Sequence, residues 1–230
     1  MKTQTKKIFF ISILLLLSAI SPNLFVAAQA GANELSTMAI QFLIPSIALI
    51  IILILLFDRL KFKDISRLAI NGIIAGILST IALQIIRETG FRLGTMPGDM
   101  PRLMGVLLLN QFASGPNFWS DLAGWAYHFW NGASFGIIFS LLVGQSKPWN
   151  GILFGVLIGI GFMVSPVVKS LGIGVFGLEF KRGFEFLVTV TLAHVAFGIT
   201  LTIILSRLNK GIPNIWYRFK TDNENNPIHV

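Results

Sequence analysis

The sequence has no cysteine among its 230 residues, and charged residues make up only 12% of it. The lack of cysteine excludes disulfides, thiolate metal sites, iron–sulfur clusters and cysteine nucleophiles, and it leaves the redox compartment undetermined. The shortage of charge comes with 54% hydrophobic residues and a mean hydropathy of +0.76, well outside the range of soluble globular proteins. The sequence therefore predicts an integral membrane protein.

The sequence also lacks the short motifs that identify common enzymes. It contains neither the H-E-x-x-H pattern of zinc peptidases nor a P-loop. The letters G-x-S-x-G occur at 132–136, but inside a predicted membrane helix rather than a sharp strand-to-helix turn. The letters G-x-G-x-x-G occur at 172–177 without a βαβ unit around them. We interpret both as chance matches and expect no enzyme, catalytic residue, metal site or cofactor.

The first of several apolar stretches has the layout of a secretory signal. Residues 1–30 combine a basic start, an apolar run over 8–20 and an A-x-A-like site at 28–30. They predict a cleaved signal peptide, with an uncleaved signal anchor as the alternative. Both interpretations place Gly31 outside the cytoplasm, so the rest of the topology does not depend on the choice.

Five further apolar stretches are long enough to cross about 30 Å of hydrocarbon. The predicted fold is all-α, with five mature transmembrane helices, or six if the signal is uncleaved, at 39–57, 68–87, 122–143, 150–168 and 186–206. An apolar piece over 103–113 is too short to span and is expected to be a re-entrant or interfacial helix. Arg87 and Glu88 are expected to pair at a helix end, and Arg102 to lie at lipid headgroups.

These stretches divide the chain after the signal into three parts. Residues 31–67 form a peripheral span and a basic cytoplasmic loop, residues 68–206 a four-helix membrane core, and residues 207–230 a cytoplasmic tail. Basic residues are in excess in 58–67, 144–149 and 207–230, which the positive-inside rule places in the cytoplasm. We therefore expect a plasma-membrane protein. Its net charge of +8 is explained by the basic residues on the cytoplasmic side of the membrane and does not indicate binding to nucleic acid.

A pattern of glycines and histidines occurs twice in the predicted core. N-G-x-x-x-G begins at 71 and again at 150, and H-x-x-x-G follows at 128 and again at 194. Such repetition indicates two copies of a two-helix unit, here in parallel orientation about an axis along the membrane normal. Glycines four residues apart let helices approach closely, and packing is the role expected of Gly72, Gly76, Gly132, Gly151, Gly155 and Gly198.

His128 and His194 are expected at nearly the same depth in the outer half of the membrane. Ionisable residues inside a bilayer are candidate functional residues by default. Together with Asn131, Asp121 and Trp125 they predict a polar pocket that binds or passes a small solute, a proton or a lipid-like ligand. Alternatively, the histidines bond only to neighbouring helices, hold a haem b between them, or form a metal site with Asp121 or Asn131.

At these residues the chain resembles a family of small, uncharacterised prokaryotic polytopic membrane proteins. The resemblance covers about residues 68–206 and rests on 71–76, 96–109, 128–132 and 194–198. It implies a fold and a topology but no activity. The alternatives to a pocket-bearing protein are a structural subunit or assembly factor of a membrane complex and a haem-binding electron-transfer protein. The expected partners are the lipid bilayer and either a second copy of the chain or a membrane complex.

Overall fold

The computed structural model describes residues 3–60 and 62–216, and every regular element within them is a helix. The all-helical class is therefore confirmed. Residues 217–230, most of the expected cytoplasmic tail, lie outside the described residues. The long helices are α1 (Thr3–Gln29), α3 (Ile44–Arg59), α4 (Lys63–Arg92), α6 (Phe118–Leu142), α7 (Pro148–Val164) and α9 (Gly183–Leu208). The short ones are α2 (Leu35–Met38), η1 (Ala39–Leu43), α5 (Met100–Leu108), α8 (Pro166–Ser170) and η2 (Val175–Gly177).

Four of the described helical segments are long and apolar enough to cross a membrane. They are Thr5–Gln29, Leu35–Arg59, Lys63–Arg92 and Gly183–Leu208. Helix α7 is apolar but has 17 residues, and α6 has 25 residues interrupted by polar side chains such as His128 and Asn131. The chain therefore has the composition of a multi-pass membrane protein, while the count of five mature spans stays a prediction.

The expected span at 39–57 is longer in the structure and contains a π-helical turn. Helices α2, η1 and α3 follow one another without a break, and Pro45 lies at the start of α3. Proline has no N–H to donate and its ring clashes with the preceding turn, so the wider turn at Ala39–Leu43 accommodates it. Phe57 is buried against α1 and α4, whereas Leu55 is 64% exposed, which leaves one face of α3 for lipid.

The helix expected over 150–168 is shorter, because it ends at Val164. Pro166 disfavours helical geometry in the residue before it, and Ser165 adopts an extended ψ of 163°. The Ser165 hydroxyl then accepts a 3.3 Å hydrogen bond from the Val167 backbone N–H and caps α8. The prediction of one continuous helix to residue 168 was therefore wrong.

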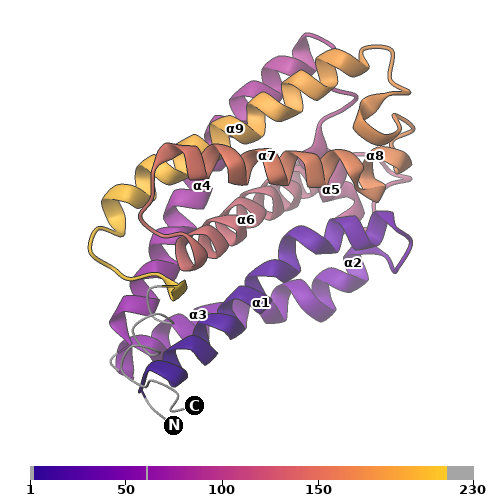
Figure 1. The fold of residues 1–230 in the computed structure, drawn as a ribbon. Coiled ribbons are helices and arrows are strands. Elements are labelled where there is room, and N and C mark those ends of the chain that lie inside the picture. The colour runs from indigo at the N-terminus through magenta and orange to yellow at the C-terminus, as the bar shows by residue number, and fades with distance from the viewer. Residues whose placement is uncertain (1–2, 61, 217–230) are drawn as a thin grey trace, which may run out of the picture.

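The bundle consists of two close helix pairs, α4 with α6 and α7 with α9, joined along α4 and α9 (Figure 1). Helix α1 lies along α6, and α3 packs on both α1 and α4. Helix α5 folds back onto α6 at the end of the bundle where α4 and α7 finish, and we call this the α5 end. Helices α1, α4 and α7 begin at the opposite end (Figure 1).

Glycine makes each helix pair close. A Cβ added at Gly76 would collide with the carbonyl of Gly132, and one at Gly136 with the carbonyl of Gly72. The same happens at the other crossing, where Gly198 faces the carbonyl of Gly151. The six glycines expected to pack thus all lie at these two crossings, where backbone meets backbone with no room for a side chain.

The two helix crossings do not superpose with the two histidines on each other. When the crossings are matched, the histidines are one helical turn apart. Gly76 lies against Gly132, but Gly155, its counterpart in the second motif, lies against the backbone of His194. His194 therefore occupies the place that Gly132 has in the first pair. His128 lies one turn further along α6, towards the α5 end.

Candidate functional site

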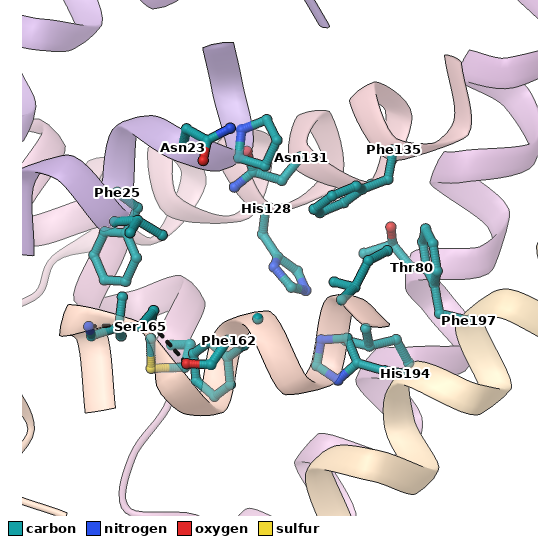
Figure 2. Close-up of a pocket in the computed structure, with 18 of the residues that line it drawn as sticks. Asn23, Phe25, Thr80, His128, Asn131, Phe135, Phe162, Ser165, His194 and Phe197 are labelled. Atoms are coloured by element: carbon teal, nitrogen blue, oxygen red, sulfur yellow. Dashed lines mark hydrogen bonds between the residues drawn. The ribbon is translucent and has the colours of Figure 1, made fainter. Parts of the chain in front are cut away.

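A cavity of about 500 Å³ lies between the two helix pairs, and α1 forms one of its walls (Figure 2). Its volume is typical of small-molecule sites in proteins. Side chains from six helices contribute most of the lining, which is largely apolar: Phe25 from α1, Leu83 from α4, Met104 from α5, Phe135 from α6, Phe154 from α7 and Phe197 from α9.

The structure brings His128, Asn131 and His194 together in this cavity. Both histidines are buried, each with 7% of its surface exposed. His194 Nδ1 lies 2.8 Å from the Val190 carbonyl, and because a carbonyl only accepts, Nδ1 carries the proton. That tautomer leaves its Nε2 as an acceptor. In the described part of the chain, His128 Nε2 is buried without a hydrogen-bond partner.

Asn131 connects the cavity to α1. Its Oδ1 accepts a 2.6 Å hydrogen bond from the Ser21 hydroxyl, and the Tyr127 hydroxyl donates a 2.7 Å bond to the Ser21 carbonyl. Asn23, two residues further along α1, lines the cavity directly. The segment expected to be a signal peptide or signal anchor therefore packs as part of the site.

Asp121 and Trp125, expected in the same pocket, are not among the residues that line the cavity. Asp121 pairs with Arg102 instead, at 3.2 Å, and both side chains are partly exposed at the α5 end. The Trp125 ring packs edge-on against His128 with ring centres 6.0 Å apart. Trp125 thus restrains the imidazole from behind, whereas Asp121 belongs to the contact between α5 and α6.

Arg87 lines the cavity although the sequence predicts that it pairs with Glu88 at a helix end. Glu88 instead accepts a 2.7 Å hydrogen bond from Arg92, one turn further along α4. Arg87 is only 8% exposed, and its guanidinium carbon lies 5.8 Å from the centre of the Phe162 ring. The sequence does contain a pattern that could have placed Arg87 in the cavity. Arg87 lies on the same helical face as Gly76, Thr80 and Leu83, at spacings of three and four residues.

The described residues offer few groups for a metal. No cluster of three or more histidine or acidic side chains is arranged to hold an ion within 3–60 and 62–216. The cavity lining itself contributes two imidazoles and the amides of Asn23 and Asn131. Its chemistry is that of an apolar chamber with hydrogen-bonding groups and one cation on its wall.

Comparison with known proteins identifies a family for this chain. No curated protein and no solved structure matches the chain. Residues 66–214 match a family of unknown function, DUF6789, and this range runs from the first turn of α4 to a few residues beyond the end of α9. It contains both glycine crossings, both histidines and Arg87, and leaves α1 outside. Since the match covers well over half of the sequence, the chain belongs to the family of unknown function DUF6789.

Proposed function

We propose that this membrane protein binds a lipid-like amphiphile in the cavity between its two helix pairs. The observation that carries the proposal is the mixed lining of one chamber: aromatic and aliphatic side chains for most of its surface, with His128, Asn131 and His194 among them. Buried polar groups are stabilised by hydrogen bonds. A ligand with a polar head and an apolar body matches both parts of this surface.

The cavity is long enough for such a molecule. Its lining on α6 runs from His128 to Ile138, ten residues along one helix. At a rise of 1.5 Å per residue this is about 15 Å. The apolar residues Phe135 and Ile138 lie further from the α5 end than His128 does. The polar head is therefore expected near the α5 end and the chain towards the middle of the bundle.

The cavity opens sideways, between α1 and α7. Asn23 on α1 and Leu157 and Gly161 on α7 all line the cavity and are also exposed at the surface. An exposed leucine in an apolar helix of a membrane protein faces lipid. A molecule already dissolved in the bilayer therefore has a direct route into the site.

The proposal includes α1 as a permanent part of the protein. Residues 1–30 then act as an uncleaved anchor, which gives six spans: α1, the α2–α3 segment, α4, α6, α7 and α9. The hydrogen bonds between Ser21, Asn131 and Tyr127 support this, because removal of α1 would open the cavity along one side and leave those groups unpaired.

We propose a plasma-membrane orientation with the α5 end outside. Lys7 and Asp64 form a 2.8 Å ion pair at the opposite end of the bundle, next to a group of basic side chains near the other helix ends there. The positive-inside rule places that end in the cytoplasm. These basic residues are Arg59, Lys63, Arg67, Lys147 and Arg207.

Two copies of one helix pair account for the arrangement of the core. In both pairs the first helix contributes N-G-x-x-x-G and its glycines meet the partner helix backbone. The one-turn difference in register supports a duplication that kept the crossing while the position of the histidine changed. The equivalent points are then occupied by Gly132 in the first pair and by His194 in the second, and both line the cavity.

The experiment that tests the binding proposal uses the full chain in lipid nanodiscs. Palmitate and its neutral counterpart monopalmitin serve as probes, and native mass spectrometry counts the molecules retained. We expect one molecule per chain for at least one probe. Gly161→Trp should abolish retention, since nothing lies within 4 Å of a Cβ there and the indole would fill the mouth.

Leu153→Trp is the matched control. Leu153 lies on the same helix, is 52% exposed and does not line the cavity. Equal retention in wild type and Leu153→Trp, with loss in Gly161→Trp, supports the proposal. No retention of either probe by the wild type, or equal retention by all three proteins, contradicts it.

A haem-binding function remains the second candidate, because two imidazoles from different helices share one cavity. Paired histidine ligation gives a strong Soret absorbance. The purified protein should show that band, and His128→Ala should remove it, if this alternative holds.

Copurification of a stoichiometric partner would favour the structural-subunit alternative instead.

A further inference from the structure

We infer that the headgroup of the bound amphiphile is an anion, a carboxylate or a phosphate, and that Arg87 holds it. This inference rests on the proposed function and names the ligand class for the same cavity. Its starting point is a buried cation: Arg87 is 8% exposed, lies within a helix long and apolar enough to span a membrane, and lines the cavity.

In the described part of the chain, no carboxylate forms an ion pair with Arg87. Over residues 3–60 and 62–216, no carboxylate oxygen lies within 4.0 Å of its guanidinium and none of its five N–H groups makes a hydrogen bond. Its guanidinium lies over the face of the Phe162 ring, 5.8 Å from the ring centre. A buried charge without a partner is strongly unfavourable, and such residues in membranes mark ligand or ion sites.

The acids near Arg87 are already engaged elsewhere. Glu88 pairs with Arg92, and Asp121 pairs with Arg102. Asp99 interacts with Arg87 electrostatically, but its carboxylate caps α5 by accepting a 3.5 Å bond from the Arg102 backbone N–H. Asp99 therefore reduces the local positive potential without filling the donors of the guanidinium.

The chemistry of the guanidinium selects the headgroup. Its planar fork of N–H donors matches the paired oxygens of a carboxylate or a phosphate, and such charge-assisted bonds are shorter and stronger than neutral ones. His128 Nε2, also buried and unpartnered in the described chain, faces the same cavity and can donate to a second oxygen of the same group. An alcohol or an amide headgroup would leave the charge of Arg87 uncompensated.

The position of Arg87 agrees with the membrane geometry of such a ligand. Arg87 lies five residues before the end of α4, about 8 Å along the helix axis. The apolar lining continues from there towards Ile138 and Phe154. An anionic amphiphile entering between α1 and α7 would keep its head near the headgroup level and its chain in the bundle, as a lipid of that leaflet does.

The experiment compares headgroups on one chain in wild-type protein and Arg87 variants. The full chain in nanodiscs is titrated with palmitate, monopalmitin, palmitylamine and inorganic phosphate, and both probe retention and the shift in Tm are recorded. We expect palmitate to bind at least roughly tenfold more tightly than monopalmitin. Palmitylamine should bind worst, because its ammonium would face Arg87.

Three variants separate recognition from packing. Arg87→Gln should lower palmitate affinity by roughly tenfold or more and leave monopalmitin affinity within about twofold. Arg87→Lys should retain part of the preference, because it keeps the charge and loses the fork. Arg92→Gln is the matched control, since Arg92 lies on the same helix with 77% of its side chain exposed, and it should behave as wild type.

The results distinguish failure of the anion inference from failure of the proposed amphiphile binding. Equal binding of palmitate and monopalmitin by the wild type overturns the anion inference while amphiphile binding stands. Absence of binding by all three amphiphiles overturns both. If inorganic phosphate alone raises the Tm of wild type and not of Arg87→Gln, the ligand is a free anion and the amphiphile assignment is wrong. If Arg87→Gln does not fold, the headgroup preference of the wild type decides.

Discussion

The hydroxyl of Ser21 donates a 2.6 Å hydrogen bond to Oδ1 of Asn131, and so links the first helix of the chain to the wall of the cavity. Tyr127 donates to the carbonyl of the same serine. Two residues of one turn of α6 therefore hold α1, one through the side chain of Ser21 and the other through its backbone carbonyl. In an apolar medium such bonds are the specific part of helix association, since lipid is as apolar as the packed side chains.

Ser21→Ala and Asn131→Ala should each lower the free energy of unfolding, by about 1 kcal/mol, and should not be additive. The shared bond should appear as a coupling of about 0.6 kcal/mol in a double-mutant cycle. The measurement is unfolding in mixed micelles. Ser12→Ala is the control, because Ser12 bonds only to the Ile8 carbonyl in its own helix and is exposed. Strictly additive effects would show that the two side chains do not interact.

Retention of α1 has a direct chemical signature. The protein purified from membranes should have an intact mass that includes residues 1–30, because α1 buries Ile11 and Leu14 completely and forms part of the cavity wall. Intact mass spectrometry and N-terminal sequencing check this. A mature N-terminus at Gly31 would instead show that α1 is removed as a signal peptide.

Gly76→Ala should lower stability by about 1–3 kcal/mol, because the added methyl group meets the carbonyl of Gly132 and the two helix backbones must separate. Gly161→Ala is the matched change on α7, where a Cβ meets nothing within 4 Å. It should leave stability unchanged or raise it slightly, since alanine favours helix over glycine. Equal effects of the two substitutions in thermal unfolding would argue against the crossing as the source of stability.

Asn209→Ala should lower the free energy of unfolding by about 1–3 kcal/mol. The Asn209 amide donates a 2.9 Å bond to Ser140 and accepts one of 2.9 Å from Asn71, so its loss leaves both partners without that contact between α4, α6 and α9. Asn150 holds the equivalent place to Asn71 in the repeated motif but is exposed. Asn150→Ala should therefore be nearly neutral in the same unfolding assay, and a large effect there would contradict this assignment.

Asp121→Asn should leave palmitate retention unchanged. Asp121 lies outside the cavity lining, and its pair with Arg102 is partly exposed, a class of ion pair that contributes little. Native mass spectrometry with palmitate checks this beside the wild type. A loss of retention comparable to that of Arg87→Gln would place Asp121 in the site after all.

Hydropathy and spacing predicted the helical membrane class and approximate positions for most of the helices. They also led to His128, Asn131 and His194, which the structure places in one cavity. These features were accessible because apolar length and helical periodicity are local properties of the sequence. The end of α7 was missed although its cause is local, because the prediction did not weigh the effect of Pro166 on Ser165.

Arg87 and Asp121 were misplaced for different physical reasons. Arg87 and Glu88 are adjacent in sequence, but neighbours on a helix do not face each other, so their opposite charges did not make a pair. Glu88 meets Arg92 at i+4 instead. Asp121 finds its partner on α5, nineteen residues earlier, through a fold-back of the chain that no local pattern specifies.

The buried Arg87 also bears on how the protein is inserted into the bilayer and then assembled into a bundle. When α4 first enters the bilayer its arginine lies about 8 Å from the helix end, close enough for a long side chain to reach the headgroup region. Phe162 is synthesised 75 residues later, and only then does the aromatic face that covers the guanidinium exist. We therefore expect the electrostatic cost of Arg87 to fall on assembly of the bundle more than on insertion of α4. A ligand that neutralises Arg87 would then act during biogenesis as well, by favouring closure of α7 over α4.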